Sequence, residues 1–189
     1  MLRRNDLVNN TATDYARLQI TLAYQFNDES LLSLALTHRS YSKNNNERLE
    51  FLGDALLNTT IAEYIFKRYP EEREGILSRL RASLVKGETL ANIAREYSLS
   101  DYLIMGEGEL KSGGFRRDSI LADVVEAIIG AIFVDASMQE SQAFILRLFN
   151  DRLENLSIDK HLKDPTTRLQ EILQAKQLPL HQYTIEHIQ

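Results

Sequence analysis

The sequence contains no cysteine, and this absence narrows the chemistry that is open to it. Disulfide bonds and thiolate metal sites are both excluded. Four scattered histidines leave little scope for a metal site built from imidazole ligands. A metal ion would therefore be held by oxygen ligands, which favours a hard cation such as Mg²⁺, with Mn²⁺ as a substitute.

Long apolar runs are missing as well. No stretch of about 20 consecutive apolar residues is present, so we expect no transmembrane helix and no membrane partner. Residues 1–13 are polar, rich in Asn and Thr, and lack the apolar core of a signal peptide. They predict a flexible N-terminus on a soluble, cytoplasmic chain.

Length and composition predict one ordinary domain with a small appendage. The chain has 189 residues, 43% of them hydrophobic, which is enough to build a core. Apolar residues recur at helical spacing over most of the chain, so the expected fold is all-α. The helices are expected at 14–24, from Asp28, at 47–69, over 76–99 with a division at Gly87, at 119–136 and at 139–155.

The stretch Asn46–Asp54, NERLEFLGD, opens the longest strongly apolar segment, which ends before Pro70. A helix that is apolar on nearly every side is usually buried. This one also carries three acids at i, i+3 and i+7, within roughly 60° of one another on the helix: Glu47, Glu50 and Asp54. Acids crowded in such a place repel one another unless a cation neutralises them, and at least one pKa should be raised.

A second helix, with Asp118 or Ser119 as its expected cap, places Asp123 and Glu126 at i, i+3 on one face. One turn further on, the same face presents Gly130. Glycine inside a helix costs about 1 kcal/mol, so close approach of another backbone is a plausible reason for it. Gly53 and Ala55 are the matching small positions on the first helix. We infer that the two helices cross closely and bring their acids together.

The segment between these helices, residues 105–119, is rich in glycine and predicts a mobile basic loop. Its cations, Lys111, Arg116 and Arg117, could contact phosphates beside a metal held by the acids. The overall net charge of −5 argues against a nucleic-acid partner only if charge is evenly spread. Acids beside a basic flank are what a nuclease needs to cut a phosphodiester.

Each feature alone has an ordinary interpretation. Three acids at this spacing are typical of a solvated helix face, and a basic glycine-rich segment is typical of a flexible surface loop. Glu74 follows a helix break, where surface acids are common, and His38 suits a structural hydrogen-bonding role. The combination of features, rather than any one of them, points to a site.

Two blocks nevertheless resemble the ribonuclease III family: NERLEFLGDA at 46–55 and LKSGGFRRDSILADVVEAIIGAIFVD at 110–135. A third, KDPTTRLQEILQAKQLPLHQYTI at 163–185, resembles the start of that family's double-stranded-RNA-binding domain. The resemblance covers nearly the whole chain after about residue 14. It implies a helical endonuclease domain at 14–156, a linker at 157–163 and a partial RNA-binding domain at 164–189, with only the first helix and first strand.

The resemblance also implies a homodimer that cuts both strands of an RNA duplex, leaving 5′-phosphates, 3′-hydroxyls and two-nucleotide 3′ overhangs. Expected substrates are ribosomal RNA precursors and some structured messenger RNAs, and no nucleotide cofactor is implied. The implied roles are metal binding for Glu50, Asp123 and Glu126, catalysis for Asp54 and Glu126, accessory acids for Glu47 and Glu74, and a dimer contact for Phe51.

Two other hypotheses stay open at this point. One is a non-catalytic RNA-binding dimer that keeps the fold, against which the complete set of acids argues. The other is an unrelated helical structural protein. Because the C-terminal unit would lack its basic last helix, we also expect weak duplex binding, with residues 164–189 either disordered or packed in a way that differs from the family.

Overall fold

A computed structural model describes residues 15–158 of the chain. Within this range the regular elements are helices, and the pairing of Thr37 with Ile104 is an isolated parallel bridge rather than a strand. The all-α prediction is therefore confirmed for the described residues. The predicted flexible N-terminus at 1–13 and the partial domain at 164–189 lie outside the described residues.

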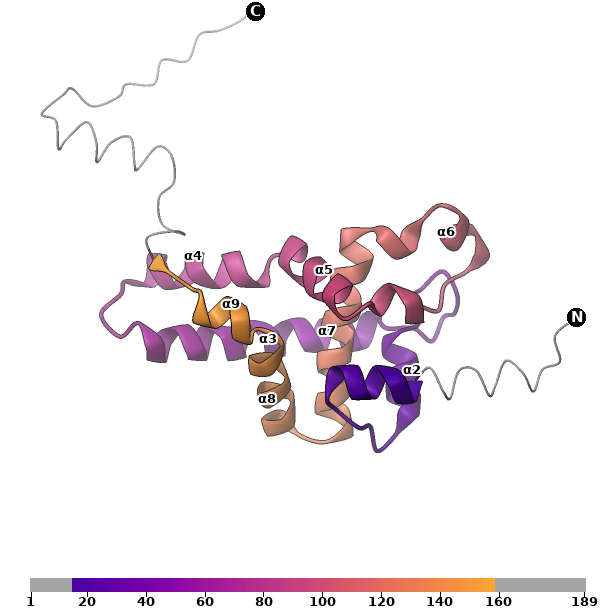
Figure 1. Ribbon diagram of the computed structural model, residues 1–189, viewed down its shortest axis with the longest axis horizontal. Helices are drawn as coiled ribbons and strands as arrows, with labels where there is room; N and C mark the ends of the chain where they lie inside the picture. The colour runs from indigo at the N-terminus through magenta and orange to yellow at the C-terminus, as the bar shows by residue number, and fades with distance from the viewer. Residues whose placement is uncertain (1–14, 159–189) are drawn as a thin grey trace, which may run out of the picture.

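The helices follow one another with short connections (Figure 1). After a helical segment at 15–22 come α2 (Glu29–Ala35), α3 (Glu47–Arg68), α4 (Glu74–Val85), α5 (Gly87–Glu96), α6 (Glu107–Lys111), α7 (Asp118–Asp135), α8 (Met138–Leu148) and α9 (Asn150–Glu154). Two short 3₁₀ helices, η1 (Leu99–Tyr102) and η2 (Gly114–Arg116), lie on either side of α6. The predicted break at Gly87 and the end of the central helix before Pro70 are both confirmed.

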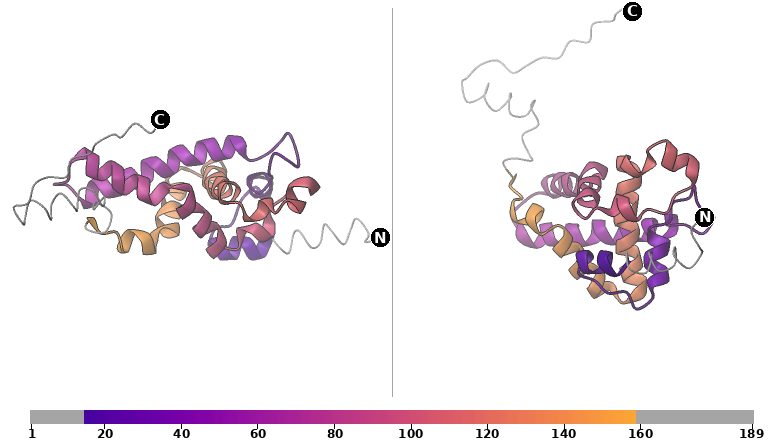
Figure 2. Two further views of the ribbon diagram at one scale, coloured as in Figure 1. Left: turned by 90° about the horizontal axis from the view of Figure 1, so that it is seen from above. Right: turned by 45° about the vertical axis from the view of Figure 1, so that its right-hand side comes forward.

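The core is built around α7, which packs against α2, α3, α5 and α8. Its residues from Ile120 to Ile132 are buried apart from the two acids, as an almost wholly apolar sequence requires. Figure 1 shows α7 crossing α3 near the middle of the molecule, and the view from above in Figure 2 shows it nearly end-on between α3 and α5. The most buried helix is thus the one that carries Asp123 and Glu126.

Two glycines allow α3 and α7 to cross at backbone contact. A Cβ atom at Gly53 would overlap the carbonyl oxygen of Glu126, and one at Gly130 would overlap the carbonyl oxygen of Leu49. The predicted close crossing is therefore confirmed. Ala55, which was expected at the same contact, is exposed instead, because it lies two residues beyond Gly53 and points away from α7.

The expectation that α3 is buried on nearly every side is wrong. Phe51 and Phe66 are 79% and 69% exposed, while Leu49, Leu57, Ile61 and Ile65 face the core. One side of the helix packs on α7 and α8, and the other leaves large apolar side chains uncovered. Exposed apolar surface of this kind is typical of an interaction site.

Two further boundaries differ from the sequence prediction. The segment expected as one helix at 139–155 is two, α8 and α9, because the chain turns at the fully buried Phe149. Helix α7 starts at Asp118, and its N-cap is Arg117 without a side-chain cap. Asp118 is the first residue inside the helix rather than its cap, and its carboxylate pairs with Arg95 of α5.

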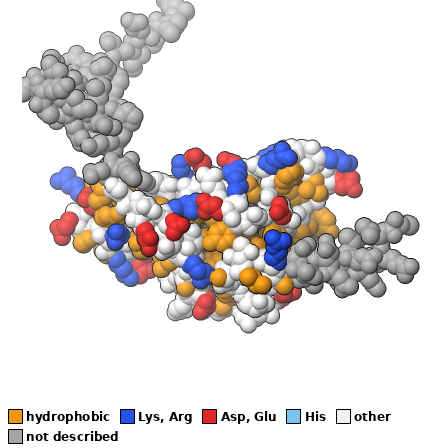
Figure 3. All heavy atoms as spheres, viewed as in Figure 1, with side chains coloured by type: hydrophobic (Ala, Val, Ile, Leu, Met, Phe, Trp, Pro, Cys, Tyr) orange, Lys and Arg blue, Asp and Glu red, His pale blue; other side chains and the backbone are white. Residues whose placement is uncertain are grey.

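Within residues 15–158, no helix combines the length and the apolar character needed to cross a membrane. On the face seen in Figure 3, acidic and basic side chains are interspersed over α4, α5 and α6. The net negative charge is therefore not gathered on this face.

Candidate active site

Three acids from the two crossing helices converge on one point. Glu50 comes from α3, and Asp123 and Glu126 come from α7. Each offers a carboxylate oxygen, and these oxygens all lie within 4.8 Å of one another. All three residues are partly buried. Three carboxylates at this spacing form an oxygen-ligand set that suits a divalent cation.

The electrostatics of this cluster fit the same interpretation. Burial, followed by the charges of Asp54, Asp123 and Glu50, raises the pKa of Glu126 from 4.5 to about 8. Burial is also the main cause that raises the pKa of Glu50 and of Asp123. Without a cation, Glu126 therefore holds a proton at neutral pH, and a bound cation would displace it. The expectation that at least one pKa is raised is confirmed, with burial as a larger cause than crowding.

Two of these acids, Glu50 and Asp123, line a cavity of about 410 Å³, whereas Glu126 is not among its lining residues. Its lining comprises His38, Arg39, Asn46, Glu47, Glu50, Glu109, Arg117, Ser119, Ile120 and Asp123. Acids from α3 and α7 thus face two guanidinium groups, an imidazole and a hydroxyl across one polar space. Such a space can hold a cation on one side and an anionic group on the other.

The remaining predicted acids occupy three different positions. Glu47 lines the cavity and pairs with Arg39, with Oε1 3.3 Å from Nη1. Asp54 lies outside the set of three converging acids, and its Oδ1 accepts a hydrogen bond of 2.8 Å from Asn58 Nδ2. Glu74 lines a separate cavity and accepts a 2.6 Å hydrogen bond from Ser78 Oγ. The structure therefore groups Glu47 with the cluster and leaves Glu74 apart from it.

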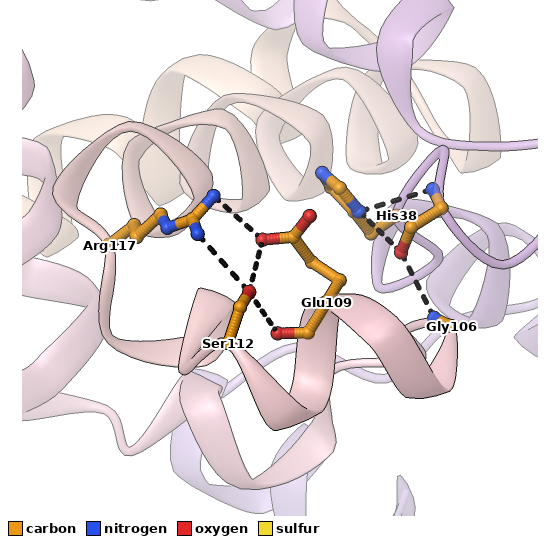
Figure 4. Close-up of polar contacts among 6 residues, drawn as sticks. His38, Gly106, Glu109, Ser112 and Arg117 are labelled. Carbon is orange, nitrogen blue, oxygen red and sulfur yellow. Dashed lines mark hydrogen bonds and ion pairs between the residues drawn. The ribbon is translucent and has the colours of Figure 1, made fainter.

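The segment predicted as a loop at 105–119 contains two short helices, α6 and η2, so that prediction is wrong in part. Arg117 is tied down within it. Its Nη1 lies 2.8 Å from Glu109 Oε1, and its Nη2 donates a 3.1 Å hydrogen bond to Ser112 Oγ (Figure 4). Gly114 has no side chain where the Glu109 carboxylate packs, which makes this arrangement possible.

Of the three predicted RNA-binding cations, Arg117 lines the cavity. Lys111 pairs with Glu107 on the exposed side of α6, at 3.3 Å. The guanidinium of Arg116 lies over the ring of Phe115, 5.0 Å from its centroid. Lys111 and Arg116 therefore extend the basic segment beyond the cavity rather than lining it.

Sequence reasoning missed four cavity residues: Arg39, Asn46, Glu109 and Ser119. The polar segment at 37–46 is held against the 104–106 segment by the Thr37–Ile104 bridge. Asn46 is buried and donates to the Ala35 carbonyl oxygen. The signal available was the density of polar residues just before the central helix, which spacing alone could not assign to a site.

Comparisons with known proteins agree with this geometry. Residues 28–153 match a family model described as Ribonuclease-III-like. A protein named Ribonuclease 3 from Pseudomonas putida (strain W619) is 56% identical over 174 residues, covering 92% of this chain and 76% of that protein. A protein of the same name from Marinomonas sp. (strain MWYL1) is 58% identical, and the match covers 92% of this chain and 77% of that protein.

Solved structures give the same result. The nuclease domain of ribonuclease III from Campylobacter jejuni, described in a study of flexibility in a region involved in dimer formation, superposes with a TM-score of 0.70 at 45% identity. That match covers 71% of this chain and 94% of the other. Dicer from Pichia stipitis matches with a TM-score of 0.54 at 30% identity, over 69% of this chain and 57% of that one.

Proposed function

The chain belongs to the ribonuclease III family and is an endoribonuclease, and on this premise we propose that it cuts double-stranded RNA by metal-assisted hydrolysis of a phosphodiester. The observation that carries the proposal is the convergence of Glu50, Asp123 and Glu126 within 4.8 Å. The donor set is all carboxylate, which fits Mg²⁺ and allows Mn²⁺ as a substitute. A bound Mg²⁺ would polarise the scissile phosphate and make a nearby water more acidic.

The protein's own groups take distinct parts in this scheme. Glu50, Asp123 and Glu126 are the residues that would hold the cation, and Glu126 gives up the proton that burial otherwise keeps on its carboxyl. Asp54, held by Asn58 beside Glu126, is assigned to orient the attacking water. Glu47 acts as an accessory acid by holding Arg39 at the cavity.

The cations position the duplex. Arg117 is held at the cavity wall, where it can contact a phosphate next to the one being cut. Lys111 and Arg116 are assigned to phosphates further along the same strand.

The products follow from the same proposal. Each cut leaves a 5′-phosphate and a 3′-hydroxyl, and paired cuts leave two-nucleotide 3′ overhangs. The proposed substrates are stems in ribosomal RNA precursors and in some messenger RNAs, and the proposed compartment is the cytoplasm, where these RNAs are made. No nucleotide cofactor takes part.

A duplex cleavage assay tests the function. A labelled RNA duplex incubated with the protein and millimolar Mg²⁺ should be cut to short duplexes with 5′-phosphates, and chelator should stop the reaction. Single-stranded RNA and a DNA duplex of the same sequence should stay intact. Binding of the duplex without any cut in Mg²⁺ or Mn²⁺ would instead support the non-catalytic alternative.

We also propose that two copies of the chain assemble through the exposed side of α3. The Phe51 side chain stands 79% exposed on this side. On the same helix and α4, an apolar cavity of about 420 Å³ is lined by Thr59, Ala62, Glu63, Ile65, Phe66, Glu74, Leu77, Ser78 and Arg81. In the proposed dimer, Phe51 of each copy enters this cavity of its partner. Because Glu74 lines the cavity, the Glu74 of one copy then lies near α3 of the other copy.

Phe51→Ala should weaken the dimer strongly. A central aromatic anchor typically contributes about 2–4 kcal/mol to an interface, or roughly 30-fold to 1,000-fold in the dissociation constant. Sedimentation at a series of concentrations measures the shift, and cleavage activity should fall with the dimer fraction. Ile20→Ala is the matched control, because Ile20 is equally exposed, at 79%, on the helix at 15–22. Equal dissociation constants for Phe51→Ala and the unaltered protein would contradict the proposal.

A further inference from the structure

The His38 ring is held by hydrogen bonds at one nitrogen. Its Nδ1 lies 2.8 Å from Ser40 Oγ and 3.2 Å from the Ser40 backbone nitrogen, which donates to it. The Ser40 hydroxyl oxygen already accepts a 3.0 Å hydrogen bond from the Gly106 N–H, so its own proton is available for Nδ1 (Figure 4). Nδ1 therefore acts as an acceptor, which leaves Nε2 as the ring nitrogen that carries the N–H.

The backbone around His38 is also held in place by hydrogen bonds and close packing. The His38 N–H donates to the Ile104 carbonyl oxygen at 2.9 Å, and the Ile104 N–H donates to the Leu36 carbonyl oxygen at 2.9 Å. Gly106 packs so closely on the Ser40 backbone that a Cβ there would overlap the Ser40 carbonyl oxygen. The imidazole is thus preorganised rather than free to turn.

Its other nitrogen faces the cavity of the acids. Within residues 15–158, both hydrogen bonds of the imidazole involve Nδ1, and Nε2 has no partner. In Figure 4 the dashed contacts of His38 all meet one ring nitrogen, and His38 lines the same 410 Å³ cavity as Glu50 and Asp123. A residue with a fixed donor that has no partner among the described residues therefore lines the same cavity as these acids and guanidinium groups.

We propose that His38 is a substrate-binding residue, whose Nε2–H donates a hydrogen bond to a non-bridging phosphate oxygen of the RNA duplex. The proposal rests on the proposed function. A phosphate oxygen is the acceptor that fits, because Arg39 and Arg117 line the same cavity and groups of this kind gather around phosphates. The Nε2–H would add one directed contact there, beside the two guanidinium groups.

Substitution of His38 by asparagine and by glutamine distinguishes a substrate-binding role from a purely structural one. The side-chain amide of Gln reaches the position of Nε2, whereas the shorter amide of Asn reaches only that of Nδ1. His38→Asn should keep the contact with Ser40 and lose about 10-fold to 100-fold in kcat/KM, as expected for one hydrogen bond to a charged group. His38→Gln should stay within a few-fold of the unaltered protein. The reverse order, with Asn more active than Gln, would mean that His38 only holds the segment.

Modified substrates identify the acceptor. Single phosphorothioates and single 2′-deoxy nucleotides are placed in turn at and beside the cut. A phosphorothioate that slows the unaltered protein but not His38→Asn marks the contacted oxygen. If a 2′-deoxy position gives that pattern instead, the donor meets the ribose and the phosphate assignment is wrong.

Ser40→Ala provides a second variant that leaves the imidazole in place. It removes the hydroxyl that keeps the proton on Nε2, so a loss of a few-fold is expected in the unaltered background and none in the His38→Asn background. Additive losses would contradict the proposal.

Thermal melting confirms that each variant folds. Cleavage by the unaltered protein, measured first, separates failure of this proposal from failure of the proposed function.

Discussion

Glu126→Gln should reduce the rate of duplex cleavage by several powers of ten. Glutamine has nearly the same shape, but it cannot supply the negative charge that a cation needs from this position. Glu126 is one of three acids within 4.8 Å of one another, so losing its charge leaves the cation with Glu50 and Asp123 alone. Single-turnover cleavage at saturating Mg²⁺ measures the effect on the chemical step rather than on binding.

The same substitution should make the metal-free protein more stable at alkaline pH. Burial and three neighbouring acids raise the pKa of Glu126 to about 8, against 4.5 for the ordinary group. Between these values the folded state keeps a proton that the unfolded state has released, so stability falls as pH rises from about 5 to about 8. Glutamine does not titrate and removes this loss, which amounts to no more than a few kcal/mol because each pKa unit corresponds to about 1.4 kcal/mol.

Melting temperatures in chelator and in Mg²⁺ check this second effect. The unaltered protein should gain stability from Mg²⁺, by about 2.7 kcal/mol at 100 times the dissociation constant, and gain more at pH 8 than at pH 6. Glu126→Gln should melt higher in chelator at pH 8 and gain little from Mg²⁺. Glu88→Gln is the control, since Glu88 pairs with Lys86 on the surface and does not line the cavity. Full activity in Glu126→Gln would remove this residue from the proposed site.

The central pair of helices could be predicted from local sequence because each carries its own signals. Helix α3 ends before Pro70, and the acids on α3 and α7 repeat at helical spacing. The crossing was predictable too, since Gly130 in a helix interior has a cost that only close packing explains. The raised pKa values followed from placing several carboxylates together before any distance was known.

The walls of the cavity could not be predicted in this way, because they depend on contacts between distant segments. Glu109 holds Arg117, and Gly114 makes room for that contact, yet nothing in the spacing of this segment shows it. The fixed position of His38 depends on Gly106, 68 positions further along the chain. Helix periodicity carries no information about such partners.

The spacing of the acids on α3 also does not show which of them joins the cluster with Asp123 and Glu126. Glu50 and Asp54 lie one turn apart on one stripe, and their spacing alone does not distinguish them. In the fold α7 passes over Gly53, and the carboxylates of Asp123 and Glu126 meet that of Glu50 while Asp54 stays exposed beside Asn58. Which acid joins the cluster is decided by where the partner helix crosses, and this is a tertiary fact.

Gly130→Ala should destabilise the fold severely, although alanine is the better helix former. On helix propensity alone the change would stabilise the protein by about 1 kcal/mol. In the fold, however, the new methyl group would overlap the Leu49 carbonyl oxygen, which belongs to the backbone of α3 and cannot rotate away. Helices α3 and α7 would have to separate, and overpacking at such a site costs about 3 kcal/mol or more. Urea unfolding measures the loss.

A control substitution and the response to Mg²⁺ test whether the loss of stability in Gly130→Ala comes from separation of α3 and α7. Gly87→Ala, at the start of α5, places its methyl group where no other described atom lies within 4 Å, so a neutral or slightly stabilising effect is expected there. Separation of the helices at Gly130 also moves Glu50 away from Asp123 and Glu126, so Mg²⁺ should no longer raise the melting temperature of Gly130→Ala even where the chain still folds. Stabilisation by Gly130→Ala would contradict the close crossing, and with it the reason that these three acids meet.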